Sequence, residues 1–236
     1  MENITLEDIE SAYLRLKRAI YYENNVLISD YVMYKENILG NFYFKKENDV
    51  IEYSCLSNYK QIGMKITIDE ERFSICTINK NEEEIGKSLV YNINNRKIVH
   101  NVISIDGKWY FEKNLEIIEK NKDIIKKVLF LKKAKIIIEE KIWNKNIVDF
   151  KLFINNNLTG FREIKDTNGN LLLRGSYLDG KKVGLWYEYE NEKVVFKVSF
   201  DEKERLCGLC KEYNLDGKII AEEIYIKGKL IKRIEK

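Results

Sequence analysis

Glycines recur at a fixed spacing in both halves of the chain. The spacing is 23 residues in the first half and 24 in the second. The glycines concerned are Gly40, Gly63, Gly86, Gly160, Gly184 and Gly208. Each begins a short apolar stretch that ends in a polar turn. A period of this size is typical of repeat proteins, in which each unit buries its apolar face only against its neighbours. The sequence therefore predicts two arrays of small supersecondary units.

The pattern within each unit predicts a β-hairpin. Gly63–Ile68 is apolar, Asp69–Glu71 is a polar turn, and Phe73–Ile78 returns as a second apolar stretch. In the second half, the stretches Ile136–Trp143 and Ile147–Ile154 have the same relation. Alternation of apolar and polar residues indicates strands with unlike faces. We therefore expect a mainly β fold of consecutive hairpins, arranged as antiparallel meander sheets.

Two segments have the period of amphipathic helices. In residues 5–21, Thr5 can cap a helix whose apolar face contains Leu6, Ile9, Tyr13, Leu16 and Ile20. In residues 113–135, Asn114 can cap a second helix, which carries eight lysines against three acidic residues. We therefore expect an N-terminal helix and a central basic amphipathic helix.

These elements predict three regions. Residues 1–112 contain the N-terminal helix and degenerate hairpin repeats, residues 113–135 form the helical insertion, and residues 136–236 form the clearer repeats. Charged residues make up 33% of the chain, and acidic groups in the first residues do not fit a signal peptide. No stretch approaches eighteen uncharged apolar residues. A cytoplasmic protein without membrane contact is expected.

The segment Gly175–Glu192 resembles the MORN-variant repeat of bacterial antitoxin-like proteins. The shared features are a tyrosine, an Asp-Gly turn, a Gly-x-Trp step and a Tyr-Glu-Tyr stretch. The resemblance covers residues 136–231 well and residues 39–104 as a degenerate echo. It departs from the pattern at Glu192, and at Cys210, which stands where Trp186 stands one unit earlier. The resemblance implies stacked hairpins and a protein-binding module or inhibitor.

A second resemblance concerns the start of the chain. Residues 5–37 are similar to the leading segment of bacterial antiphage reverse transcriptases. The Tyr-x-Asp-Asp motif of the polymerase palm is absent from this sequence. The resemblance therefore implies no polymerase activity, only a setting in phage defence or in its inhibition.

No set of residues in the sequence points to catalysis. Cys207 and Cys210 have the spacing of a redox pair or half a zinc site, but both occupy repeat positions. A four-thiol site with Cys55 and Cys76 would require the two arrays to fold together. His100 is the single histidine, and its strand position favours packing. We expect no enzyme, no cofactor and no metal.

The expected function is capture of a partner protein, in the manner of an antitoxin or of an anti-CRISPR-like inhibitor of a defence nuclease. Trp186 is expected to be packed, and Tyr187 and Tyr213 displayed. The alternative is a nucleic-acid-binding protein that uses the basic segment 113–135. Exposed edge strands also make a homodimer credible. The candidate partner-binding residues are Tyr187, Tyr189, Tyr213, Tyr225, Lys126, Lys127, Lys132 and Lys133.

Overall fold

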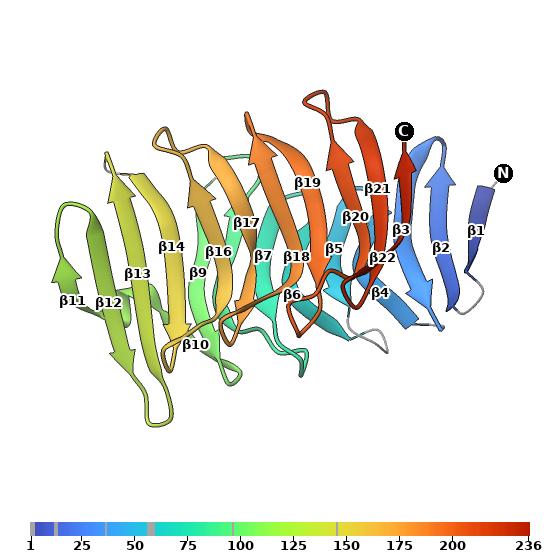
Figure 1. The fold of residues 1–236 in the computed structure, drawn as a ribbon. Coiled ribbons are helices and arrows are strands. Elements are labelled where there is room, and N and C mark those ends of the chain that lie inside the picture. The colour runs from blue at the N-terminus through green and yellow to red at the C-terminus, as the bar shows by residue number, and fades with distance from the viewer. Residues whose placement is uncertain (1–2, 12–13, 36, 56–59, 96, 145) are drawn as a thin grey trace.

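The computed structural model describes residues 3–11, 14–35, 37–55, 60–95, 97–144 and 146–236. These residues form two antiparallel sheets, in which the strands follow one another in chain order (Figure 1). The first sheet consists of β1 (Asn3–Ser11), β2 (Leu14–Glu23), β3 (Val26–Tyr34), β4 (Asn37–Lys46), β5 (Asp49–Cys55), β6 (Gln61–Ile68), β7 (Arg72–Ile78), β8 (Gly86–Asn92), β9 (Ile98–Ile105) and β10 (Lys108–Phe111). The expected meander of hairpins is confirmed.

The second sheet continues the meander after a short connection, the 3₁₀ turn η2 (Glu112–Asn114). Its strands are β11 (Glu116–Lys120), β12 (Ile124–Phe130), β13 (Lys135–Trp143), β14 (Asn146–Ile154), β15 (Asn157–Leu158), β16 (Gly160–Lys165), β17 (Leu171–Leu178), β18 (Lys181–Glu190), β19 (Lys193–Phe200), β20 (Gly208–Tyr213), β21 (Ile219–Ile226) and β22 (Lys229–Glu235). The short strand β15 pairs with β14, beside the main path of the sheet.

The expectation of an N-terminal helix over residues 5–21 is wrong, because residues 5–11 and 14–21 lie in the paired strands β1 and β2. Leu16 and Arg18 lie on one face of β2, and both are buried. A charged residue at a buried strand position obscures the period-two pattern, so the apolar residues around it match a helical period instead.

The expectation of a central basic helix over residues 113–135 is also wrong, because residues 116–130 form the hairpin of β11 and β12. The Oδ1 atom of Asn121 accepts hydrogen bonds from the backbone N–H groups of Asp123 and Ile124, which fixes the turn. Pairs of isoleucines, such as Ile117 with Ile118, fit a helical stripe, but their β-branched side chains favour strands. No α-helix occurs among the residues that the structure describes.

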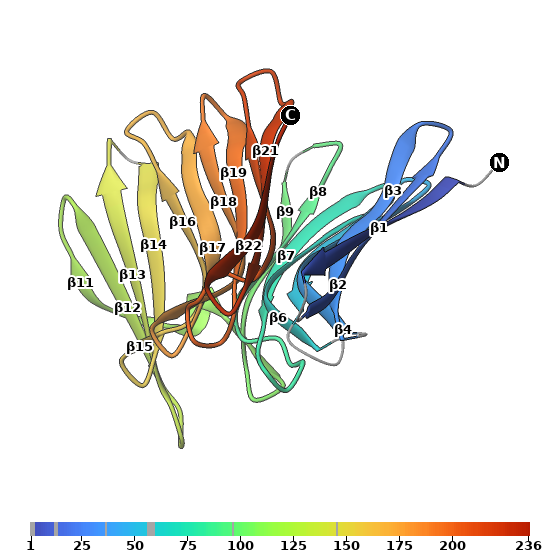
Figure 2. The same cartoon turned by 45° about the vertical axis from the view of Figure 1, so that its right-hand side comes forward.

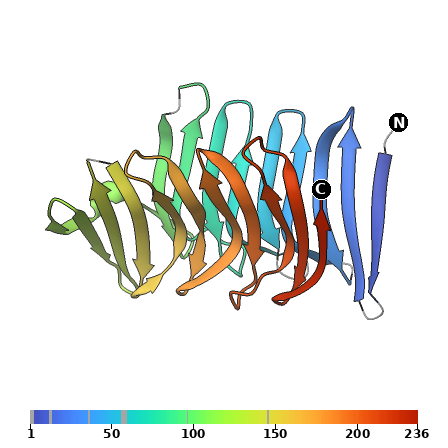
Figure 3. The same ribbon diagram turned by 45° about the horizontal axis from the view of Figure 1, so that its top comes forward.

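The two sheets pack face to face (Figures 1 and 3). The strand order of the second sheet runs opposite to that of the first, so β1 and β22 lie at the same end of the molecule. They are closest where the glycines of one array meet those of the other. The pairs are Gly40 with Gly208, Gly63 with Gly184, and Gly86 with Gly160. From these contacts the sheets diverge toward the other end of their strands (Figure 2). The two periods of the sequence therefore describe the two sides of one interface.

Apolar side chains from both sheets form the core next to the glycines. Its central cluster joins Met64, Ile66 and Ile75 of the first sheet with Phe161 and Leu185 of the second. Further clusters on either side continue this core along the interface. The core holds the sheets together where they are close, and the space farther from the glycines contains polar groups.

Candidate binding cleft

A cavity of about 230 Å³ lies between the diverging sheets. Its residues come from β3, β4 and β5 on one side and from β19 and β20 on the other. They are Leu27, Asp30, Asn41, Tyr43, Glu52, Lys197, Leu209, Lys211 and Tyr213. We call this cavity the cleft. Side chains two residues apart on a strand share a face, which is why Leu209, Lys211 and Tyr213 form one wall.

A buried arginine links the two sheets beside the cleft. Arg18, which is 4% exposed, donates from Nε and Nη2 to the two carboxylate oxygens of Asp30, each at 3.0 Å. It also donates to both oxygens of Glu222 on the opposite sheet, at 2.7 and 2.8 Å. Lys211 donates a further hydrogen bond to Asp30. Bidentate pairs of this kind fix geometry strongly, so the contact between Arg18 and Glu222 holds β2 and β21 in a fixed position across the two sheets.

A second polar group in the cleft is centred on Glu52. Lys197 Nζ donates to Glu52 Oε1 at 2.7 Å, and the hydroxyl of Tyr187 donates to Oε2 of the same carboxylate. Glu52 comes from the first sheet, whereas Lys197 and Tyr187 come from neighbouring strands of the second. This group therefore also joins the sheets.

These contacts keep the carboxylates ionised. Burial alone would raise the pKa of Asp30, but the hydrogen bonds from Arg18 and the charge of Lys211 outweigh burial and lower it. The pKa of Glu52 is likewise lowered, because Lys197 and Tyr187 outweigh its burial. For Glu222, Arg18 and then Lys211 outweigh burial, and the pKa is lowered. At neutral pH all three groups are anions with cationic partners.

Tyrosines also line both walls of the cleft. Tyr43 and Tyr213 are half-buried, and burial followed by the charge of Glu52 raises the pKa of each phenol. Tyr189 is also half-buried, and its ring centre lies 6.2 Å from that of Tyr187. The phenols are therefore protonated at neutral pH, and each can donate and accept hydrogen bonds.

The structure separates the four tyrosines that the sequence analysis selected. Tyr187, Tyr189 and Tyr213 lie on the wall of the second sheet that faces the first. Tyr187 is 6% exposed, so the expectation that it is displayed is wrong. Tyr225 instead lies on the outer face of the second sheet. Trp186 is 2% exposed, as expected, although it too packs on the outer face.

The four selected lysines do not form one basic surface. Lys126 lies 3.1 Å from Glu119 and 3.7 Å from Glu139. Lys127 donates to Glu112 at 2.5 Å and to Glu140 at 3.0 Å. Lys132 and Lys133 are exposed in the connection between β12 and β13. Two of the four charges are thus already neutralised by carboxylates, which reduces the attraction of this segment for phosphate.

The thiols described in the structure are buried. Burial raises the pKa of Cys76, Cys207 and Cys210 to about 12. The side chain of Cys55 lies outside what the structure describes. His100 is exposed, with its ring 5.8 Å from that of Trp109, so it is not packed as expected. In the described part of the chain, no three His, Cys, Asp or Glu residues are grouped to hold a metal.

Sequence reasoning missed the charged residues of the cleft. Arg18 and Asp30 lie on the paired strands β2 and β3, 12 positions apart, whereas Glu222 is 204 positions from Arg18 and meets it only because the sheets face each other. A signal for one of them exists: Lys211 alternates with Leu209 and Tyr213, so it shares their buried face. A lysine on such a face predicts a carboxylate opposite, but the sequence does not say which one.

No protein-family model matches the chain, and no curated protein is significantly similar to it. Within the described residues, no helix is long and apolar enough to cross a membrane.

Proposed function

We propose that this protein is a non-catalytic binding protein that captures a partner protein in the cleft and inhibits the partner by occupying it. The observation that supports this proposal most is that tyrosines from two facing sheets, Tyr43 and Tyr213, line a cavity together with ion-paired side chains. Tyrosine is enriched at protein interfaces because it offers a large rigid surface and a polar tip.

The electrostatics of the cleft favour binding over acid–base catalysis. A general acid or base works best with a pKa near the ambient pH. Cationic partners hold the pKa values of Asp30 and Glu52 below their usual range, whereas the pKa of the Tyr213 phenol is raised above its usual value. Because the carboxylates are already paired, they serve to position the walls of the cleft.

The chemistry of the walls fits a polypeptide segment. The hydroxyls of Tyr43 and Tyr213 can each donate to a carbonyl and accept from an N–H group, and Leu27 and Leu209 supply apolar contact. The resemblance to the MORN-variant repeat supports the same class of function, with a toxin or a defence nuclease as the partner. Repeat scaffolds serve many functions, so the residues of the cleft support this proposal more strongly than the fold does.

The test begins with affinity purification from the native host and identification of the protein that co-elutes. The affinity of that purified partner is then measured by calorimetry for the wild type, for Tyr213→Ala and for Tyr43→Ala. We expect the affinity of each variant to fall about thirtyfold or more, since truncation of an interface hot spot costs about 2 kcal/mol or more.

Tyr31→Ala is the matched control. Tyr31 lies on the outer face of the first sheet, where its ring packs against Phe42 at 5.4 Å. Its loss removes a similar ring without touching the cleft. Equal affinities for the cleft variants and the control would overturn the proposal, as would co-purification of bulk RNA alone.

A further inference from the structure

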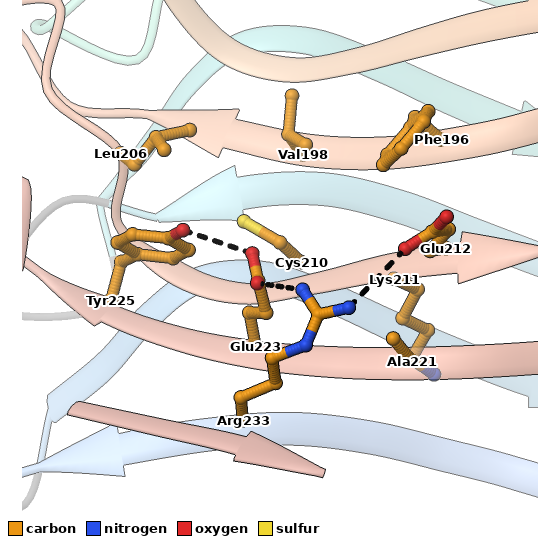
Figure 4. A pocket seen from close by; sticks show the side chains of 10 residues that line it. All are labelled: Phe196, Val198, Leu206, Cys210, Lys211, Glu212, Ala221, Glu223, Tyr225 and Arg233. Carbon is orange, nitrogen blue, oxygen red and sulfur yellow. Dashed lines mark hydrogen bonds and ion pairs between the residues drawn. The ribbon is translucent and has the colours of Figure 1, made fainter. Parts of the chain in front are cut away.

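A second cavity, of about 290 Å³, lies on the outer face of the second sheet, opposite to the cleft (Figure 4). Its floor and apolar walls are Phe196, Val198, Leu206, Cys210, Ala221 and Tyr225. Glu212, Glu223 and Arg233 form a charged rim. We call this cavity the Cys210 pocket. It shares Lys211 with the residues around the cleft, although that amine points to the other face, toward Asp30.

The preceding repeat shows what fills the corresponding position. Trp186 follows Gly184 by two residues, as Cys210 follows Gly208. The indole of Trp186 lies over Gly175, where an added Cβ would come within 2.0 Å of the ring. Cys210 has a much smaller side chain, and Val198 and Ala221 beside it are also small. The repeat therefore has an aromatic ring in one unit and an open pocket in the next.

The surroundings of the two positions also correspond in charge. The amine of Lys182 lies 4.8 Å from the ring centre of Trp186, within the range of a cation–π contact. At the Cys210 pocket, the guanidinium of Arg233 provides a cation on the rim, with its side chain 45% exposed. Arg233 is held there by Glu223 at 2.5 Å.

The rim also offers a hydrogen-bond acceptor. Glu223 accepts from the hydroxyl of Tyr225 at 2.9 Å as well as from Arg233. Glu212 lies 3.9 Å from Arg233, which is longer than a hydrogen bond, so its carboxylate is oriented but retains accepting capacity. An apolar floor, a cation and a carboxylate acceptor together match an indole, which has a π face and one N–H donor.

We propose that the Cys210 pocket binds a tryptophan side chain of the partner protein, as a second contact on the face opposite to the cleft. The partner's ring occupies the position in this unit that corresponds to the position of Trp186 in the preceding unit. Arg233 lies against the ring, and Glu212 accepts the indole N–H. The inference rests on the proposed function in one respect, namely that the partner is a protein.

The test uses N-acetyl-tryptophanamide as the probe and the full-length protein in solution. Titration followed by two-dimensional NMR should give saturable shifts at Cys210, Ala221 and Arg233. N-acetyl-leucinamide, which lacks both the ring and the donor, should shift these signals at least about threefold less at the same concentration. Absence of saturable shifts with the tryptophan probe, or equal shifts with both probes, overturns the inference.

Variants locate the binding. Cys210→Met fills the floor with an apolar chain and should abolish saturable binding. Arg233→Ala removes an exposed side chain and should weaken binding by roughly twofold to fivefold, the range expected for one exposed cation–π contact. Lys229→Gln is the control on the same strand, because Lys229 is exposed and lies outside the pocket. Unchanged binding by Cys210→Met together with Arg233→Ala overturns the inference.

This outcome is independent of the cleft. Tyr213→Ala should leave the affinity for the tryptophan probe unchanged, because Tyr213 lies on the other face of the sheet. If the probe binds while the cleft variants leave partner affinity unchanged, the proposed function fails and the pocket stands. If the cleft variants lose the partner but the probe does not bind, the pocket fails and the proposed function stands.

Discussion

Replacement of Gly63 by alanine tests the contact between the glycine ladders. Gly63 has a φ of +75°, and an added Cβ would lie 2.6 Å from both the Cα atom of Gly184 and the carbonyl oxygen of Val183. Both atoms belong to the backbone, so no side chain can move to relieve the overlap. The left-handed conformation costs alanine about 1–2 kcal/mol, and overpacking of a closed contact costs about 1–3 kcal/mol. We expect Gly63→Ala to lower the free energy of unfolding by about 2–5 kcal/mol.

Gly107→Ala separates the two contributions. Gly107 has a similar φ of +70°, but an added Cβ would meet no atom within 4 Å. This variant should lose only the conformational cost of about 1–2 kcal/mol. Urea unfolding of both variants, followed by circular dichroism, measures the difference. Equal losses of stability in the two variants would refute the argument that backbone contact between the sheets requires glycine at these positions.

Three further predictions concern the buried groups. Arg18→Met leaves Asp30 and Glu222 without their guanidinium partner and should cost about 3–5 kcal/mol in urea unfolding, and a loss below about 1 kcal/mol would contradict the buried network. Asp30, Glu52 and Glu222 have lowered pKa values in the folded state, so the stability that they contribute is present above about pH 4 and lost as pH falls through the folded values. Unfolding free energies measured between pH 3 and 7 should therefore decrease toward the acid end, and a flat profile would exclude this linkage. Cys207 and Cys210, with pKa values of about 12, should resist iodoacetamide at pH 8 until urea unfolds the chain, as read by peptide mass spectrometry. Rapid labelling in the absence of urea would show that these thiols are accessible.

The hairpin units could be predicted from sequence because turns and alternation are local properties. The strands β13 and β14 lie close to the expected stretches. Gly86, Gly160 and Gly208 begin strands as expected, whereas the other three glycines of the ladders, Gly40, Gly63 and Gly184, lie inside β4, β6 and β18. The facing of the two ladders could not be predicted, since it depends on contacts between residues far apart in the sequence, such as Gly40 and Gly208. Local periodicity contains no information about which unit of one array meets which unit of the other.

The two expected helices failed for related reasons. In β2, the buried charge of Arg18 is compensated by Glu222, a partner that lies 204 positions away. In β11 and β12, adjacent isoleucines put apolar side chains on both faces of a strand, which is compatible with a helical stripe as well. The candidate site was also predicted only in part, because local sequence patterns do not identify partners that lie far away in the sequence. Tyrosines near the cleft could be selected from one array alone, whereas ion pairs such as Lys197 with Glu52 join residues of both arrays.

The pairing of the glycines constrains how a chain of this kind can change in length. Each unit of the first sheet touches one unit of the second, in reversed order, as Gly63 touches Gly184. Loss of a single hairpin from one sheet would leave its counterpart without a facing surface and would shift all later pairs. Evolution is therefore expected to add or delete units as matched pairs, one in each half of the chain.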